Sequence, residues 1–166
     1  MVDVDWDRLK GVWYNELGSN MSLNIFDERG GEFSGEYNST VGKAVNSYGL
    51  SGWVDSDPPR GQGISIGWAV SYRNAHSTAT WSGQFFDSDH AGEGHDDHHD
   101  HGGKIITQWL LTTSTLPGPK NTWNSTHLGR DTFTRRKPSH AEIAQARAMT
   151  CMTDGSPRME DILSML

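Results

Sequence analysis

The sequence predicts an all-β protein, an eight-stranded antiparallel up-and-down (meander) β-barrel that closes on itself. Turn signals divide most of the chain into segments at roughly the 8–14 residue spacing of antiparallel barrels and sandwiches. The 166 residues include 19 glycines and 7 tryptophans but only 34% apolar residues, which disfavours a helical bundle and suits short strands joined by tight turns. An even number of strands in this order can close and remove its exposed edges. A barrel of this size holds one small ligand.

The expected strands follow one another along most of the chain, at 11–18, 21–28, 33–39, 47–56, 63–72, 76–87, 103–116 and 122–135. Turn-forming residues separate them, as in Arg29-Gly30-Gly31, Asp57-Pro58-Pro59-Arg60-Gly61, Arg73-Asn74-Ala75 and Pro117-Gly118-Pro119. Most connections are short, so strands adjacent in sequence are expected to be adjacent in the sheet. We therefore place one barrel domain at 8–137, with a His/Asp-rich loop insertion at 87–103.

Residues 138–166 differ in character and are assigned to a C-terminal extension. Ser139-His140-Ala141-Glu142 is a capping-box pattern, and the alanine-rich run to Met149 favours a helix. Apolar residues recur at helical spacing in 159–166. We expect a mostly exposed extension that is partly helical or disordered. The alternative is that it docks on the barrel or enters the mouth of a neighbouring subunit's pocket.

Charge and hydropathy exclude several classes of partner. The net charge is -7, acidic residues cluster at 87–100, and no basic stripe is present, so nucleic acid is not an expected partner. No apolar stretch is long enough to cross a bilayer. The chain starts without the pattern of a signal peptide, which predicts a protein inside the cell, or a secreted one whose leader was removed. The single cysteine, Cys151, allows no intrachain disulfide.

Several polar residues are predicted to line the barrel interior. Asn15, Leu17 and Ser19 lie two apart, so in a strand they face one side. The remaining expected lining is Tyr37, Ser39, Val41 and Lys43, then Ser77, Ala79 and Trp81, then Trp109 and Leu111, and finally Asp131. Aromatic, hydroxyl, amide and carboxylate groups together suit a small, flat polar head with an apolar body and an anionic end. Trp6, Trp53 and Trp68 are assigned to the structural core instead.

Six blocks of sequence resemble the avidin/streptavidin family of biotin-binding proteins. They are Trp13-Tyr14-Asn15-Glu16-Leu17-Gly18-Ser19, Gly67-Trp68-Ala69-Val70, His76-Ser77, Thr80-Trp81-Ser82-Gly83-Gln84, Thr107-Gln108-Trp109-Leu110-Leu111 and Gly129-Arg130-Asp131-Thr132-Phe133-Thr134. The likeness covers about residues 10–137 in order. Phe85-Phe86, Gly61-Gln62-Gly63 and the alanine-rich tail make the chain most similar to the tamavidins, the fungal avidin-like proteins. That similarity favours a cytoplasmic location.

The resemblance implies a role in biotin binding for each matching residue. Asn15, Ser19 and Tyr37 would donate to the ureido oxygen, and Ser39 and Asp131 would accept from the ureido N–H groups. Tyr72, Trp81 and Trp109 would wall the ring, with Leu17, Val41 and Leu111 completing the apolar lining. Ser77 and the backbone N–H of Lys43 would hold the valerate carboxylate, and Trp123 would reach a neighbouring subunit's site in a homotetramer.

The implied function is high-affinity, non-covalent sequestration of biotin in a deep pocket at one end of the barrel, with a defensive or antinutritional role. No enzymatic activity and no cofactor are implied. Two positions depart from the family pattern. Ala79 stands where a hydroxyl usually faces the thiophene sulfur, a loss of about 1 kcal/mol. Tyr72 stands where Trp or Phe is common, and it adds a hydroxyl that needs a partner. We therefore expect tight binding somewhat below the family's best.

Catalysis and a functional metal site are not expected from the residues. His76 and Ser77 are adjacent in an expected strand, so their side chains point to opposite faces and cannot form a nucleophile–base pair. The histidines of the acidic insertion could bind Zn, Ni or Cu incidentally; they are His90, His95, His98, His99 and His101. An insertion of this composition is also typical of a solvated, disordered loop.

Two other functions stay open at this point. One is a transport or storage barrel for another small ligand, although Asn15, Ser19, Tyr37, Ser39 and Asp131 argue against a wholly apolar pocket. The other is an interaction module that uses the tail or the acidic loop. Deleting residues 138–166 separates the second from biotin binding, which should survive the deletion.

Overall fold

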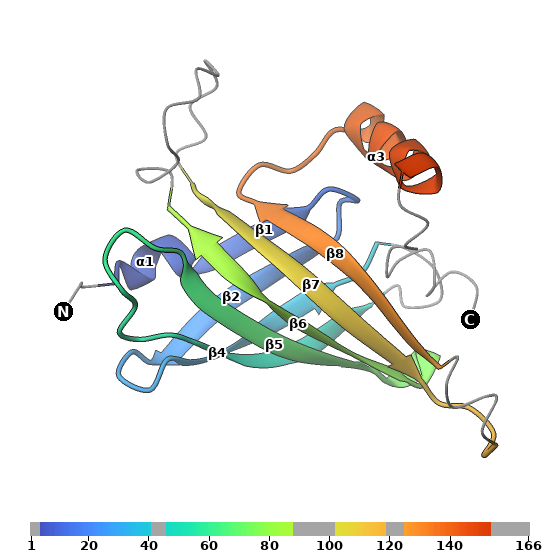
Figure 1. Cartoon of the computed structure of the whole chain (residues 1–166), viewed down its shortest axis with the longest axis horizontal. Helices are drawn as coiled ribbons and strands as arrows, with labels where there is room; N and C mark the ends of the chain where they lie inside the picture. The colour runs from blue at the N-terminus through green and yellow to red at the C-terminus, as the bar shows by residue number, and fades with distance from the viewer. Residues whose placement is uncertain (1–3, 41–45, 88–101, 119–124, 154–166) are drawn as a thin grey trace.

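The protein forms a closed barrel of eight antiparallel strands connected in sequence order (Figure 1). The computed structural model describes residues 4–40, 46–87, 102–118 and 125–153. The strands are β1 (Gly11–Asn15), β2 (Asn20–Asp27), β3 (Glu32–Asn38), β4 (Ser47–Val54), β5 (Ile64–Tyr72), β6 (Ser77–Phe86), β7 (Lys104–Thr113) and β8 (Thr126–Thr134). Strand β8 pairs with both β7 and β1, which confirms the predicted meander and its closure.

Alternating burial along the strands builds the core inside the barrel. In β4, Tyr48, Leu50 and Val54 are buried while the residues between them are exposed or lack a side chain. The same period of two places Ile66, Trp68, Val70 and Tyr72 of β5 inside. Trp68 is buried as predicted, but the prediction that Trp53 belongs to the core is wrong. Trp53 is 61% exposed because it lies on the outward face of β4.

The first strand is shorter than predicted, and beyond its end a side chain takes over the hydrogen bonding to β8. The expected strand 11–18 stops at Asn15, and Glu16 to Gly18 form a turn in which Gly18 has φ +87°. A positive φ favours glycine, which ends the strand there. Strand β1 pairs with β8 only at Tyr14 and Asn15. Beyond that point the Glu16 carboxylate accepts the backbone N–H of Thr132 at 2.9 Å, so the β8 backbone stays hydrogen-bonded.

The other strand limits agree with the sequence predictions to within two or three residues, except near the β7–β8 connection. The expected strand 103–116 ends at Thr113, and the expected strand 122–135 begins only at Thr126. Residues 119–124 lie outside the described residues. The β5–β6 connection is the short 3-10 helix η2 (Arg73–Ala75), followed by His76 with φ 48°. Ser77, and not His76, is therefore the first residue of β6.

A short helix, α1 (Trp6–Leu9), packs at one end of the barrel and was not predicted. Leu9 is buried, and its carbonyl oxygen accepts a hydrogen bond from Trp13 Nε1 at 2.9 Å. Arg135 fixes this segment from the end of β8. Its guanidinium lies 3.8 Å from the Trp13 ring centroid and donates to backbone carbonyls of Arg8, Lys10 and Val12. Burial lowers the pKa of the Arg135 guanidinium, although not enough to remove its charge.

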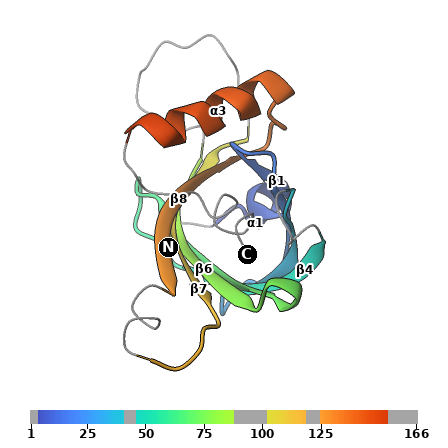
Figure 2. The same cartoon turned by 90° about the vertical axis from the view of Figure 1, so that its right-hand side faces the viewer.

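The helix α3 (His140–Thr153) runs along the outside of the barrel, beside β8 and β1 (Figures 1 and 2). The predicted capping box is confirmed: Glu142 accepts the Ser139 N–H at 2.7 Å, and Ser139 Oγ accepts the Glu142 N–H at 3.3 Å. Most of its described side chains are exposed, as expected. Ile143 makes a contact with the barrel, because its Cδ1 lies 2.9 Å from the place a Cβ of Gly18 would take. Among the described helices, none has the length and apolar character needed to span a membrane.

Candidate functional site

The buried polar side chains gather toward one end of the barrel, which we call the polar end. It is formed by the turn at 16–19, the end of β3, the β5–β6 connection and the end of β7, and it faces the viewer in Figure 2. The buried polar residues of the described chain are Asn15, Ser19, Ser39, Ser77, Thr107 and Asp131. At the opposite, apolar end the interior holds Phe33, Val54, Ile66, Phe85, Ile105 and Phe133. Buried polar groups are costly, so this asymmetry marks the polar end as a candidate site.

A tight turn places Asn15, Leu17 and Ser19 together. All three are buried, as predicted, but the shared face comes from the turn and not from a continuous strand. Asn15 Oδ1 accepts the Leu17 N–H at 3.1 Å, an Asx-type hydrogen bond that orients the Asn15 amide. The Asn15 N–H donates to the Ser19 carbonyl at 2.9 Å, and the Gly18 N–H donates to the Asn15 carbonyl at 3.0 Å.

The end of β3 approaches the same turn. The backbone N–H of Thr40 lies 3.4 Å from Ser19 Oγ, and the Thr40 hydroxyl lies 3.5 Å from the Leu17 carbonyl. Ser39, next to it, is buried. Two residues before Ser39 comes Tyr37, whose side chain is buried between other aromatic rings. These contacts place Ser19 beside the end of β3, and the buried Tyr37 and Ser39 lie on that segment.

Asp131 is a buried carboxylate held by an indole. It is 1% exposed, and its Oδ2 accepts a hydrogen bond from Trp81 Nε1 at 2.9 Å, which links β8 to β6 over the intervening β7. The Thr107 hydroxyl donates to the Asp131 backbone carbonyl at 3.1 Å. A carboxylate is rarely buried this completely unless a hydrogen-bonding environment holds it. Asp131 and Trp81 therefore form the electrostatic centre of the candidate site.

Aromatic rings surround this centre. The Tyr37 ring centroid lies 5.2 Å from that of Trp81 and 6.3 Å from that of Tyr72. Trp68 stacks behind Trp81 at 5.5 Å with an interplanar angle of 17°. Trp109 lies against β8, where a Cβ on Gly129 would be only 2.1 Å from its Cζ2. A glycine at 129 is thus what lets the Trp109 indole lie across that strand.

An apolar band and a pair of hydroxyls complete the polar end. Ala79 pairs with Val70 on one side and Leu111 on the other, and all three are buried. One step nearer the barrel end, Ser77 pairs with Tyr72 and Thr113. Among the described residues, the hydroxyl oxygens of Ser77 and Thr113 are buried without a hydrogen-bond partner, as is that of Tyr48.

Thr113 and Tyr48 were missed as candidate site residues. The signal was present, because Trp109, Leu111 and Thr113 alternate along one strand face. Tyr48 likewise alternates with the inward Leu50, and its ring centroid lies 5.0 Å from that of Tyr72. A buried hydroxyl without a protein partner is a group that a ligand or water can satisfy.

Some predicted residues lie outside the described residues. They are Val41, Lys43 and Trp123, together with His90, His95, His98, His99 and His101 of the insertion. Within the described chain, no group of three or more His, Cys, Asp or Glu side chains is placed to hold a metal ion. His76 is exposed and Ser77 is buried, which confirms that these neighbours point to opposite sides.

A closed eight-stranded meander with hydrogen-bonding groups buried at one end belongs to the class of up-and-down barrels that hold one small ligand. The chain matches the model of the avidin family over residues 4–136. It is 32% identical to avidin of Gallus gallus over 132 residues, covering 76% of this chain and 77% of that protein. It is 30% identical to avidin-related protein 4/5 of Gallus gallus over 129 residues, covering 76% and 77%. The chain therefore belongs to the avidin family, which confirms the resemblance; the closer likeness to the tamavidins stays a prediction.

Proposed function

We propose that the protein is a non-catalytic biotin-binding barrel that sequesters the vitamin. The observation that carries this proposal is the buried Asp131 carboxylate, hydrogen-bonded by Trp81 at the same end of the barrel as the buried Asn15, Ser19 and Ser39. These groups offer both donors and acceptors, and the ureido group of biotin needs both. Membership of the avidin family supports the same ligand.

In this proposal the ureido group lies among the polar side chains. Because Asn15 Oδ1 already accepts the Leu17 N–H, the donor atom Nδ2 is the one offered to the ureido oxygen. Ser19 and Tyr37 complete the set of donors. Ser39 and Asp131 accept the two ureido N–H groups, and the negative charge of Asp131 polarises the ureido oxygen toward its donors in a dry site.

The apolar part of biotin would contact the aromatic rings and the Ala79 band. Tyr72, Trp81 and Trp109 wall the ring system, with Leu17, Val41 and Leu111 as further lining. Ala79 offers no hydroxyl to the ring sulfur, so the affinity would fall below the family's best. Ser77, with the backbone N–H of Lys43, would hold the carboxylate. The buried Ser77 hydroxyl has no hydrogen-bond partner among the described residues, which supports this placement.

Self-association is part of the proposal, and the outer surface supports it. None of the residues in β4, β5 or β6 is charged. On the neighbouring strands, Leu110 and Leu128 pair directly and are 49% and 57% exposed. An exposed face of this kind is typical of a protein interface. We propose a homotetramer in which Trp123 completes a neighbouring subunit's site, as the family resemblance implies.

Titration calorimetry with biotin tests the proposal. The wild-type protein should bind one biotin per chain, and the double variant Asn15→Ala/Asp131→Ala should lose binding while remaining folded. A folded, ligand-free wild-type sample that gives no heat with biotin would refute the proposal and leave a barrel for another small ligand. Truncation of residues 138–166 should leave biotin affinity intact, whereas an interaction module that depends on the tail would lose its function.

The assembly is tested separately by light scattering on the intact protein. Leu110→Lys/Leu128→Lys should lower the measured mass, because two cations in an apolar interface are unfavourable. Trp123→Ala should loosen the oligomer and weaken biotin binding together. A monomeric wild-type protein, or a Trp123→Ala variant with unchanged mass and affinity, would contradict this part of the proposal.

A further inference from the structure

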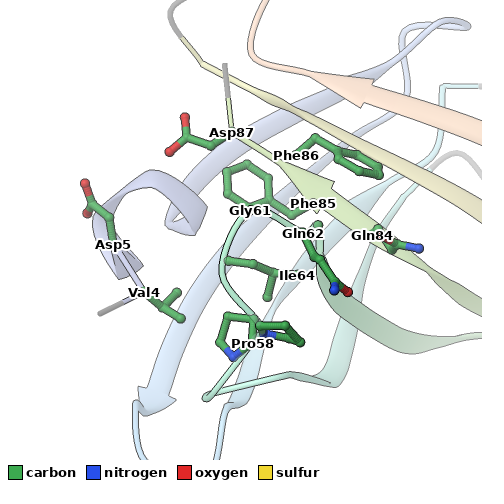
Figure 3. Close-up of a pocket in the computed structure, with 12 residues that line it drawn as sticks. Val4, Asp5, Pro58, Gly61, Gln62, Ile64, Gln84, Phe85, Phe86 and Asp87 are labelled. Carbon is green, nitrogen blue, oxygen red and sulfur yellow. The ribbon is translucent and has the colours of Figure 1, made fainter. Parts of the chain in front are cut away.

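A second pocket opens at the apolar end of the barrel, away from the candidate biotin site (Figure 3). Its volume is about 460 Å³, within the range of small-molecule sites. Ile64 begins β5 and pairs with Phe85 near the end of β6, whereas Tyr72 and Ser77 pair at the other end of the same two strands. Eight residue steps along an extended strand correspond to roughly 26 Å. The two sites are thus well separated.

The walls of this pocket come from three separate parts of the chain. The residues that precede α1 contribute Val4 and Asp5, and the end of β6 contributes Gln84 to Asp87. The β4–β5 loop with the start of β5 contributes Pro58, Pro59 and Gly61 to Ile64. Figure 3 shows Val4 facing Pro58 and Ile64, with the Phe85 ring nearby. Phe85 belongs to the barrel core, so one wall of the pocket is rigid.

Glycine 63 lets the aromatic and amide walls come together. A Cβ at Gly63 would lie 2.7 Å from Cε1 of Phe86 and 2.6 Å from Oε1 of Gln84. The Phe86 ring and the Gln84 amide therefore converge on the bare backbone of the loop. A flat ring can lie along such a surface while its polar group reaches an amide.

The charged residues that line this pocket are acidic. Asp5 and Asp87 lie at one edge, and no lysine, arginine or histidine is among the lining residues of the described chain. Arg8 forms salt bridges with both carboxylates, so its charge is shared between them. Two carboxylates around one guanidinium leave a net negative charge at the edge. Such an edge attracts a cation and repels an anion.

We propose that this pocket is a second ligand site, for a small aromatic amine. The ring would lie against Phe85, Ile64 and Pro58, and the ammonium group would sit at the edge beside Asp5. The amide oxygens of Gln62 and Gln84 accept further N–H groups. This chemistry differs from that of the polar end, where the expected ligand carries a carboxylate.

Tryptamine and indole-3-propionate test the proposal as a pair of probes with the same ring and opposite charge. Amide NMR spectra would be recorded on the full chain saturated with biotin, so that the polar end is occupied. Tryptamine should shift the amides of Gly63, Gln62 and Gln84 in a saturable way, and indole-3-propionate should bind at least about tenfold more weakly. No saturable shift with tryptamine, equal binding of both probes, or competition with biotin would each overturn the proposal.

A charge reversal with a matched control makes the test sharper. Asp5→Lys should weaken tryptamine binding about tenfold and improve that of indole-3-propionate. Asp7→Lys makes the same charge change on the neighbouring helix α1, but Asp7 does not line the pocket. It should therefore leave the affinity for tryptamine within about twofold. Both side chains are mostly exposed, at 59% and 89%, so both variants should fold. Equal effects of the two variants would show a general charge effect and refute a site.

Discussion

The two ends of the barrel are built from the same eight strands, yet they bury different chemistry. At the apolar end, Phe33, Phe85, Ile105 and Phe133 fill the interior with side chains that need no hydrogen bonds. At the polar end, Asn15, Ser39 and Ser77 occupy inward positions that could equally have been apolar. Burying polar groups opposes folding, so the polar end lowers the stability of the fold. Burial of apolar side chains at the other end offsets this loss. The difference indicates that the interior of the apolar end maintains the fold, whereas in the proposed function the polar end serves biotin.

The largest expected effect is on stability, at the apolar end. Phe133→Ala removes a fully buried ring that packs edge-on against Trp68, with ring centroids 5.6 Å apart. The free energy of unfolding should fall by about 3–5 kcal/mol in urea denaturation. A loss below about 1 kcal/mol would contradict the role of this end as the core.

The next largest effect is expected on biotin affinity, from a nearly isosteric substitution of Asp131 at the centre of the candidate site. Asp131→Asn keeps the shape but removes the charge that Trp81 contacts and that the ureido group is proposed to contact. Biotin affinity measured by calorimetry should fall about 10- to 150-fold, the value of a hydrogen bond to a charged group.

Thr107→Val is the matched control for Asp131→Asn, because Thr107 contacts only the backbone carbonyl of Asp131 by a side-chain hydrogen bond. It should reduce biotin affinity much less than Asp131→Asn, even if it lowers stability by about 1 kcal/mol. Equal losses of affinity in the two variants would mean that Asp131 acts through packing and not through its charge.

A smaller effect is expected for Ser77 near the polar end, where stability and biotin affinity should change in opposite directions. Ser77→Ala removes a buried hydroxyl that has no protein partner in the described chain, so stability should stay unchanged or rise by up to about 1 kcal/mol. Biotin binding should nevertheless weaken, several-fold to about tenfold, because the carboxylate loses a donor. The methyl ester of biotin has no carboxylate, so its affinity should differ less between the wild-type protein and Ser77→Ala than the affinity of biotin does. A variant that is less stable and binds biotin normally would indicate a structural role for Ser77.

The sequence was sufficient to predict most of the fold because the signals for it are local. Alternation and turn residues located the eight strands, and Ser139 and Glu142 located the start of α3. The four-residue helix α1 was missed because it is too short to show helical periodicity. Trp53 was misplaced because tryptophan was treated as a core residue, although alternation with Gly52 and Val54 places it outside.

For the candidate site, residue identity was easier to predict than geometry. Asn15, Leu17 and Ser19 are buried together, but the turn that joins them depends on the positive φ of Gly18 and on the Asx-type hydrogen bond of Asn15. The Trp81–Asp131 hydrogen bond joins residues 50 positions apart, on the two strands that flank β7, so it depends on the register of three neighbouring strands. Alternation along β7 and β4 places Thr113 and Tyr48 on inward faces, but the lack of a hydrogen-bond partner for their hydroxyls is visible only in the structure.

The smallest expected effect lies outside both ends, in the capping box of α3. Hydrogen bonds from Arg136 and then from Ser139 hold the pKa of the Glu142 carboxyl at about 2, below its usual 4.5. A carboxyl with a lowered pKa in the folded state stabilises the fold above its unfolded pKa. That contribution is lost as the pH falls from about 4.5 through about 2.

The amide signal of Ser139 should therefore titrate near pH 2 by NMR, and Glu142→Gln should abolish the titration. The Glu142 side chain is exposed, so the global unfolding energy and the affinity for biotin should hardly respond. A titration near 4.5 would mean that the capping box is not formed in solution. A simultaneous loss of biotin binding would mean that α3, through Ile143 and Gly18, supports the polar end after all.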